Sequence, residues 1–125
     1  MAKILIVEDD LDLVETYTDL LESHEHSVSA VLRASEAIRM LTRCKLDVVL
    51  LDLNLPGDSG VIVINFIRSY KPIANIKIIV ASGHPEMLNQ IKYVSSRVDA
   101  ILSKPVSNHE LLDLIEASLG KSSEN

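Results

Sequence analysis

Residues 48–60 decide the fold, and they read Val48-Val49-Leu50-Leu51-Asp52-Leu53-Asn54-Leu55-Pro56-Gly57-Asp58-Ser59-Gly60. The four apolar residues at the start are typical of a central parallel strand that is covered on both faces. An acid follows at once, and the turn residues after it predict a loop. Because neighbouring parallel strands need a crossover connection, a helix is expected before the next apolar run. The stretch therefore predicts an α/β fold with a carboxylate at the end of a central strand.

Working outward, short apolar runs alternate with longer amphipathic segments along the chain. Strands are predicted at 4–7, 28–32, 48–51, 76–81 and 98–102, and helices at 11–22, 34–41, 61–67, 85–94 and 107–120. The segment 61–64 is β-branched and favours a strand by propensity, but its helical spacing and the required crossover favour a helix. Five strands alternating with five helices predict an α/β fold, a doubly wound five-stranded parallel sheet with helices on both faces.

Composition limits the class of protein. The chain has 125 residues, of which 47% are hydrophobic and none is tryptophan, so one aliphatic core is expected. The net charge of −6 argues against direct nucleic-acid binding. The single cysteine, Cys44, fits a reducing compartment, and no apolar stretch is long enough to span a membrane, so we expect a cytoplasmic protein without a membrane partner. We predict one domain at 1–120 and a polar tail or truncated linker at 121–125. His24 and His26 fall in a predicted turn and are expected to be solvated.

Polar residues follow four of the predicted strands. They are Glu8-Asp9-Asp10 after the first strand, Asp52 after the third, Ser82 after the fourth and Ser103-Lys104-Pro105 after the fifth. In an open parallel sheet, ligands bind at the carboxyl ends of the strands. At about 5 Å and an effective dielectric near 20, each pair of carboxylates repels by roughly 3 kcal/mol. Lys104 supplies one positive charge, and a divalent cation such as Mg²⁺ would supply the rest.

Simpler explanations exist for single members of this set. Asp10 precedes the first helix and can cap it, and Ser82 fits an ordinary turn serine as well as a hydroxyl donor. Capping does not explain Asp52, which follows an apolar strand with no helix start beside it. The P-loop and GxGxxG patterns are absent, and an acidic turn accepts phosphate only through a metal. The set favours phosphoryl transfer to Asp52, with a cation and Lys104 offsetting the charge.

Taken together, these motifs closely resemble the receiver domain of response regulators in two-component signalling, the CheY-like superfamily. The resemblance covers residues 3–120, and the matched segments are 4–10, 51–57, Gly60, 81–83 and 103–105. Each motif alone is weak, but the combination, with each motif at the end of the right strand, is highly specific. The resemblance implies a flavodoxin-like (βα)5 fold with strand order 2-1-3-4-5.

The resemblance also implies a role for each site residue. Asp52 is the expected phosphoacceptor, which takes its phosphoryl group from a histidine kinase or a histidine phosphotransfer protein in a reaction that depends on Mg²⁺ or Mn²⁺. Ser82 and Lys104 are expected to contact the phosphoryl group, and the bond from Lys104 to Pro105 is often cis in such domains. The expected metal ligands are Asp9, Asp52, the backbone carbonyl of Asn54 and, through water, Glu8.

A switch is the expected consequence of phosphorylation. Ser82 would follow the phosphoryl group, and the face formed by the fourth helix, fifth strand and fifth helix would repack. Many family members rotate an aromatic residue on the fifth strand, but here that position holds Ile101, which puts an aromatic readout in doubt. Asn54 and His84 occupy variable positions that flank the acceptor and tune phosphoryl lifetime, although His84 equally fits a surface residue near a helix start.

Three functions follow from these patterns. The leading one is a signalling switch that catalyses its own phosphorylation and dephosphorylation without being a conventional enzyme, and that acts on a downstream effector or fused output domain which the sequence does not identify. The alternative is a receiver-like protein-interaction module that works without phosphorylation, which Ile101 leaves open. A metal-dependent phosphohydrolase is disfavoured, because Asn54 stands where such enzymes often place a second acid.

Overall fold

The computed structural model describes residues 1–83, 92 and 95–120 of the chain. Its sheet has five parallel strands in the order β2-β1-β3-β4-β5, as the resemblance implied. The strands are β1 (Lys3–Val7), β2 (Ser27–Val31), β3 (Val48–Leu51), β4 (Lys77–Ser82) and β5 (Ala100–Ser103). The order reverses beside β1, so the carboxyl ends of β1 and β3 meet at the topological switch point.

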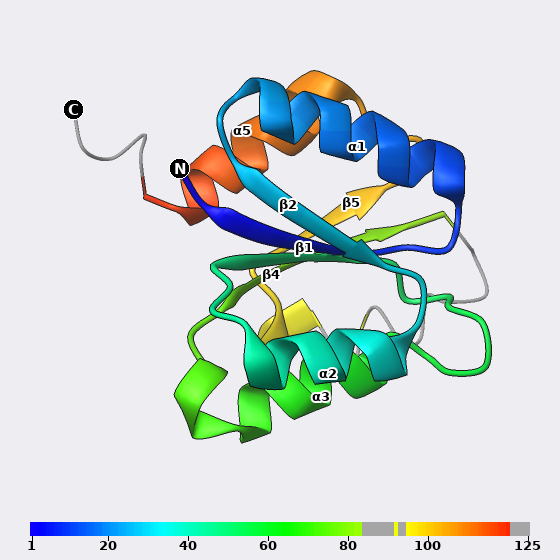
Figure 1. Cartoon of the computed structure of the whole chain (residues 1–125). Coiled ribbons are helices and arrows are strands. Elements are labelled where there is room, and N and C mark those ends of the chain that lie inside the picture. The colour runs from blue at the N-terminus through cyan, green and yellow to red at the C-terminus, as the bar shows by residue number, and fades with distance from the viewer. Residues whose placement is uncertain (84–91, 93–94, 121–125) are drawn as a thin grey trace.

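Helices cover both faces of the sheet, as the doubly wound fold predicts. Helices α1 (Leu11–Ser23) and α5 (Asn108–Ser118) lie above it in Figure 1, and α2 (Ala34–Arg43) and α3 (Val61–Ser69) lie below it. Short 3-10 turns at Lys71–Ile73 and Ser95–Arg97 lead toward β4 and β5. The helix predicted at 85–94 lies outside the described residues, apart from Lys92. Within the described residues, no helix has the length and apolar character needed to cross a membrane.

The β-branched segment at the start of α3 is helical, as its spacing predicted and its propensity did not. Val63, Ile64 and Ile67 are fully buried beneath the sheet, whereas Ile62 is exposed. Burying three large aliphatic side chains on one helical stripe outweighs the small helix propensity penalty of each β-branched residue.

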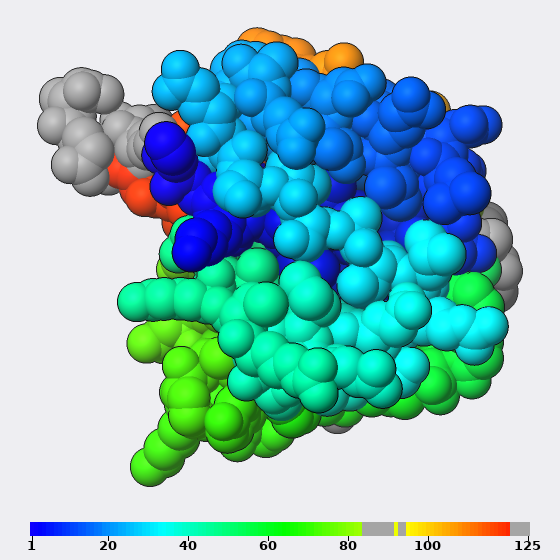
Figure 2. All heavy atoms as spheres, viewed as in Figure 1, coloured from blue at the N-terminus to red at the C-terminus, as the bar shows by residue number. Residues whose placement is uncertain are grey.

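Two aliphatic clusters hold the layers together, one on each face of the sheet. Leu5, Val49 and Ile78 point from neighbouring strands toward α2 and α3, and Ile6 and Leu50 point toward α1 and α5. Successive residues of a strand face opposite sides, so a strand buried on both faces is apolar throughout. The outer strand β2 differs, because its side chains form the surface between α1 and α2 (Figure 2).

In the sequence, Val28, Ala30 and Leu32 alternate with other residues and predict a half-exposed strand. The structure confirms the strand, as β2, but does not bury these three residues on one side. Val28 and Val31 pack against the two clusters, while Ala30 is exposed and Leu32 lies beyond the strand with 40% of its surface exposed. An edge strand that is half covered by helices on both faces does not alternate simply between core and solvent. The simple alternation read from Val28, Ala30 and Leu32 was therefore wrong.

The starts of α1 and α5 and the end of α5 have the residue types that helix ends favour, and Asp10 caps α1 as the sequence allowed. The Asp10 carboxylate accepts hydrogen bonds from the backbone N–H groups of Asp12 and Leu13, so Asp10 is the N-cap of α1. The Ser107 hydroxyl accepts from the backbone N–H of Glu110 at the start of α5. Gly120, just after α5, has a positive φ of 76°, which suits a residue that ends a helix.

Candidate functional site

The site lies at the carboxyl edge of the sheet, meaning the edge where all five parallel strands end. Val7 and Leu51 are register partners on β1 and β3, so the next residues, Glu8 and Asp52, leave neighbouring strands at the same level. The backbone N–H of Asp52 bonds to the Val7 carbonyl at 3.0 Å and extends this pairing by one residue. Parallel pairing therefore places the two carboxylates side by side, although 44 residues separate them in the sequence.

Three acids converge there, as the sequence predicted. One carboxylate oxygen each of Glu8, Asp9 and Asp52 can be chosen so that all three lie within 4.8 Å of one another. Glu8 and Asp52 are buried, with 3% and 4% of their surfaces exposed, whereas Asp9 is exposed. Two buried acids and one exposed acid form a site that reaches solvent at Asp9, with the hard oxygen donors that Mg²⁺ prefers.

Lys104 brings a cation into contact with both buried acids. Its Nζ lies 2.7 Å from Glu8 Oε1 and 3.2 Å from Asp52 Oδ2, and 19% of its side chain is exposed. Lys104 follows β5 and reaches across the carboxyl edge past the end of β4. The Lys104–Pro105 peptide bond is cis, as the resemblance suggested. A cation shared by two buried carboxylates neutralises part of their mutual repulsion.

The pKa values of Glu8 and Lys104 both shift upward in this environment. Burial raises the pKa of the Glu8 carboxyl, and its hydrogen bonds from Lys104 and the Asp10 backbone offset only part of that rise. Burial alone would lower the pKa of Lys104, but the hydrogen bond to Glu8 and the negative charge of Asp52 outweigh it and raise the pKa. Lys104 thus stays protonated, while burial disfavours the ionised form of Glu8, a desolvation cost that a further cation would relieve.

The loop after β3 fixes the orientation of Asp52. Its Oδ1 accepts a hydrogen bond from the backbone N–H of Asn54 at 3.0 Å, and the Gly60 N–H bonds to the Leu53 carbonyl at 2.7 Å. A Cβ atom at Gly60 would lie 2.5 Å from the Asp52 carbonyl oxygen, so only glycine lets the loop close this tightly. Asn54 itself is exposed, beside the acids.

Ser82 ends β4 next to this cluster. It is 6% exposed, and within the described residues its hydroxyl has no hydrogen-bond partner. Ile101 lies on β5 in register with Val80; it is half-buried and packs against the cluster beneath the sheet. His84 is outside the described residues. The structure therefore brings together Glu8, Asp9, Asp52, Lys104 and the Asn54 backbone, with Ser82 at the end of the adjacent strand β4.

Sequence reasoning missed one residue near the site, Tyr17 of α1. Tyr17 is 3% exposed, and with Asp10 and Lys104 it lines a hollow of about 330 Å³ between α1 and the segment after β5. In the sequence it was one apolar position in a helical stripe, and that stripe does place it in the core. The signal that could have found it is its polar end, because a buried tyrosine hydroxyl usually has a hydrogen-bond partner.

Comparisons with known proteins identify the family of this chain. The profile of the family described as response regulator receiver domain matches residues 4–116. The chain therefore belongs to the response regulator receiver domain family.

Among curated relatives, the "Two-component response regulator-like APRR3" of Arabidopsis thaliana is 34% identical over 114 residues, which cover 90% of this chain and 23% of that protein. Two further relatives are the "Transcriptional regulatory protein CpxR homolog" of Haemophilus influenzae, 28% identical over 98% of this chain, and the "Cell cycle transcriptional regulator CtrA" of Caulobacter vibrioides, 29% identical over 96% of it. This chain spans about half of their length, 52% and 51%.

Solved structures show the same fold. A CheY-like response regulator receiver domain protein from Methanospirillum hungatei superposes with a TM-score of 0.85 at 25% identity, covering 100% of this chain and 99% of that one. The response regulator TrrA of Thermotoga maritima, solved in complex with Mg²⁺-BeF, superposes with a TM-score of 0.82 at 24% identity over 94% of this chain and 99% of that one, which shows a shared fold.

Proposed function

We propose that this chain is a phosphoacceptor switch in which Asp52 takes a phosphoryl group from a histidine kinase or a histidine phosphotransfer protein. The observation that carries the proposal is the buried Asp52 carboxylate, held between two further acids and the Lys104 ammonium. Phosphoryl transfer needs positioning and charge neutralisation more than covalent machinery, and this arrangement supplies both.

The hydrogen bonds favour Asp52 over its neighbours as the nucleophile. Both Glu8 oxygens are engaged, with Oε1 bound by Lys104 and Oε2 bound by the Asp10 N–H. Asp9 is exposed and has fewer constraints on its position. Asp52 is fixed by the Asn54 N–H at one oxygen, and its contact with Lys104 is the longer of the two that Lys104 makes. In the transfer, a bond forms between an Asp52 oxygen and phosphorus as the bond between phosphorus and the donor breaks.

A divalent cation fits the acids that surround Asp52. The residues that would hold it are Asp9, Asp52, the Asn54 carbonyl and, through water, Glu8. When bound, Mg²⁺ or Mn²⁺ would offset negative charge on the phosphoryl oxygens. The acid cluster and the raised pKa of Glu8 support this assignment, and so does the Mg²⁺-BeF complex of TrrA, which has the same fold.

Ser82 and Lys104 are the residues that would respond to the new phosphoryl group. Lys104 already contacts Asp52, and the Ser82 hydroxyl, which has no hydrogen-bond partner among the described residues, could donate to a phosphoryl oxygen. Movement of Ser82 at the end of β4 would be transmitted to β5 and α5, which together with the fourth helix predicted at 85–94 form the expected output face. With Ile101 at the usual aromatic position, we expect packing changes rather than ring rotation to carry the signal. Asn54 would tune access of water to the phosphoryl group, as would His84.

The experiment is intact-mass measurement after incubation with acetyl phosphate and Mg²⁺. We expect one phosphoryl adduct in the wild-type protein, and no adduct with Asp52→Asn or with EDTA. A phosphoryl adduct that still forms in the Asp52→Asn variant would show that Asp52 is not the phosphoacceptor. Absence of any adduct, together with no change in the NMR spectrum on adding beryllofluoride, would overturn the proposal and favour an interaction module that works without phosphorylation.

A further inference from the structure

Two buried hydroxyl groups in the described part of the chain have no hydrogen-bond partner, and they are Ser82 Oγ and Tyr17 Oη. Leaving a buried hydroxyl unsatisfied costs free energy, so such a group calls for a physical explanation. Ser82 has one in the proposed function, because the phosphoryl group on Asp52 would be its partner. Tyr17 lies on a different element and has no role in that scheme.

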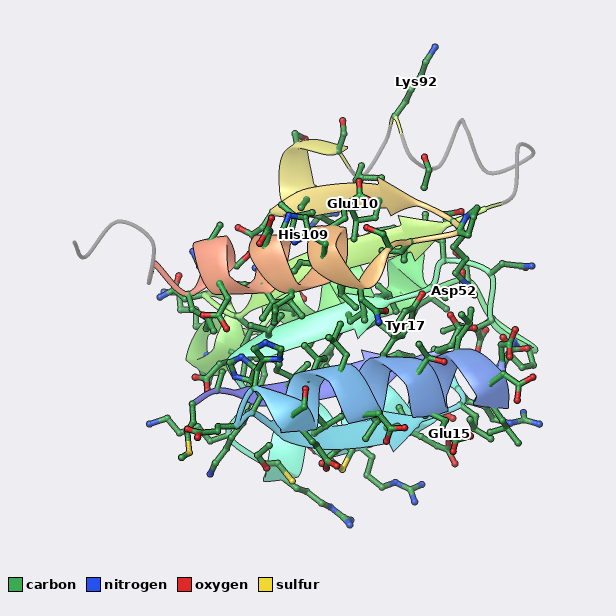
Figure 3. The ribbon with its side chains drawn as sticks, turned by 90° about the horizontal axis from the view of Figure 1, so that it is seen from above. Glu15, Tyr17, Asp52, Lys92, His109 and Glu110 are labelled. Carbon is green, nitrogen blue, oxygen red and sulfur yellow. The ribbon has the colours of Figure 1, made fainter. Side chains whose placement is uncertain are left out.

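Tyr17 extends from α1 toward the site. Side chains on a helix lean toward its N-terminus, and the N-terminus of α1 lies at the carboxyl edge of the sheet beside the acids. Tyr17 points inward from α1 on the side of the molecule where Asp52 lies, whereas Glu15 of the same helix points away (Figure 3). The ring packs in the cluster above the sheet, and with Lys104 it lines the hollow between α1 and the segment after β5.

The groups that act electrostatically on the Tyr17 hydroxyl are those of the site itself. Burial raises its pKa, with the positive charge of Lys104 opposing that rise and the carboxylates of Glu8, Asp52 and Asp10 adding to it. The hydroxyl therefore keeps its proton and is available as a donor. Carboxylates that could accept a hydrogen bond act on it, but within the described residues none does, and the Lys104 ammonium occupies Oε1 of Glu8.

We propose that Tyr17 is a positioning residue for the phosphorylated state, in which its hydroxyl donates to the Glu8 carboxylate once Lys104 has turned to the phosphoryl group. This inference rests on the proposed function. Lys104 holds Glu8 at 2.7 Å and Asp52 at 3.2 Å, and a phosphoryl group on Asp52 adds negative charge at the longer contact. As Lys104 moves toward that charge, Glu8 Oε1 loses the direct hydrogen bond from the ammonium while the side chain remains buried. The Tyr17 hydroxyl, a buried donor without a partner in the described residues, would replace the lost hydrogen bond, as Ser82 would provide one for the phosphoryl group itself.

The variant Tyr17→Phe separates this role from simple packing. Phenylalanine keeps the ring that fills the cluster and removes only the unpartnered hydroxyl, so the free protein should unfold at the same temperature or slightly higher. The matched control is Tyr70→Phe, because Tyr70 is 40% exposed at the end of α3 in the opposite layer. Beryllofluoride with Mg²⁺ is the probe, since it stands in for the phosphoryl group on an aspartate.

The experiment measures the unfolding temperature of each protein with and without the probe, and the dissociation constant of beryllofluoride by NMR titration. For Tyr17→Phe we expect an unchanged free protein and about a tenfold weaker affinity for beryllofluoride, which corresponds to one hydrogen bond to a charged group. Tyr70→Phe should match the wild type in both measurements.

Two results would overturn the inference. One is equal beryllofluoride affinity in Tyr17→Phe and the wild type. The other is a Tyr17→Phe protein that loses equal stability in both states, which is the signature of packing alone. Failure of the proposed function looks different, because the wild-type protein itself would then show no beryllofluoride response that Asp52→Asn abolishes.

Discussion

The two edges of the sheet differ in how completely their polar groups are hydrogen-bonded. At the amino edge, where the strands begin, Arg68 donates to the carbonyls of Arg97, Ala74 and Ile76 and to the Asp99 carboxylate, at 2.7–3.1 Å. At the carboxyl edge, two carboxylates share one lysine, and the hydroxyls of Ser82 and Tyr17 lack partners within the described residues. Among the described residues, the polar groups at the amino edge have hydrogen-bond partners, whereas two hydroxyls at the carboxyl edge have none.

His26 shows the same completeness at the amino edge. Its Nδ1 accepts from the backbone N–H of Ala2 at 3.1 Å, so Nε2 carries the proton and donates to Glu116 at 3.0 Å. These bonds join the chain start, the turn before β2 and helix α5. We infer from this comparison that paired polar groups stabilise the fold at the amino edge. The carboxyl edge keeps charged groups and hydroxyls available for a ligand or a covalent group.

The largest effect is expected from breaking the satisfied edge with Arg68→Ala. The change removes the Arg68 donor from three carbonyls and leaves the Asp99 carboxylate with the Ile78 N–H but without its cation, and we expect a loss of about 3 kcal/mol in the free energy of unfolding. Urea denaturation measures it. Arg39→Ala on the exposed face of α2 is the control, with an expected change within about 0.5 kcal/mol. If Arg68→Ala and Arg39→Ala lost equal stability, the hydrogen bonds of Arg68 at the amino edge would not contribute to the stability of the fold as proposed.

The sequence predicted the carboxyl edge better than the amino edge, and the reason is physical. In a parallel sheet, the residue that follows each apolar strand must lie at the carboxyl edge, so Glu8, Asp52 and Lys104 could be placed from strand positions alone. His26 and Glu116 are 90 residues apart, and no strand end places them together. His26 was expected to be solvated and is instead buried, with 4% of its surface exposed, because the chain start folds over it.

The sequence predicted which residues belong to the site better than it predicted how their side chains are oriented. Nothing in the sequence spacing shows that Lys104 lies closer to Glu8 than to Asp52, since that depends on how the chain leaves β5. Tyr17 belonged to a helical stripe whose pattern reports burial only, and its polar end carries no periodic signal.

An intermediate effect with a distinct pH dependence is expected for Glu8→Gln in the absence of divalent cations. The pKa of Glu8 is raised above its ordinary value of 4.5, chiefly by burial, so the folded protein binds this proton more tightly than the unfolded chain. Ionisation of Glu8 therefore weakens folding as pH rises through 4.5 and on through the folded pKa. Glutamine does not ionise, and Lys104 keeps Asp52 as its partner.

Glu8→Gln should thus match the wild type in stability at low pH and exceed it at neutral pH. The measurement is urea denaturation in EDTA from pH 4 to 8. Glu15→Gln is the control, because Glu15 is exposed on the outer face of α1 (Figure 3), and its difference from the wild type should not grow with pH. A Glu8→Gln protein that becomes relatively less stable toward neutral pH would show that the Lys104 pair outweighs desolvation and would reverse the assignment.

The smallest effect is expected from one substitution made at two serines. Ser107→Ala removes a hydroxyl that accepts the Glu110 N–H at the start of α5, and it should cost about 1 kcal/mol of stability. Ser82→Ala removes a buried hydroxyl without a partner in the described residues, so the free protein should change by less than about 0.5 kcal/mol in either direction. Urea denaturation of both variants under one condition gives the comparison directly.

Beryllofluoride then decides what the unpaired Ser82 hydroxyl is for. One outcome is that Ser82→Ala leaves the stability of the free protein unchanged but weakens the stabilisation by beryllofluoride and Mg²⁺. The hydroxyl then has its hydrogen-bond partner only in the phosphorylated state, and the function explains why it has none in the free protein. If Ser82→Ala instead lowers the stability of the free protein as much as Ser107→Ala does, the hydroxyl already has a partner there, and the contrast between the two edges would fail at the residue on which it depends most.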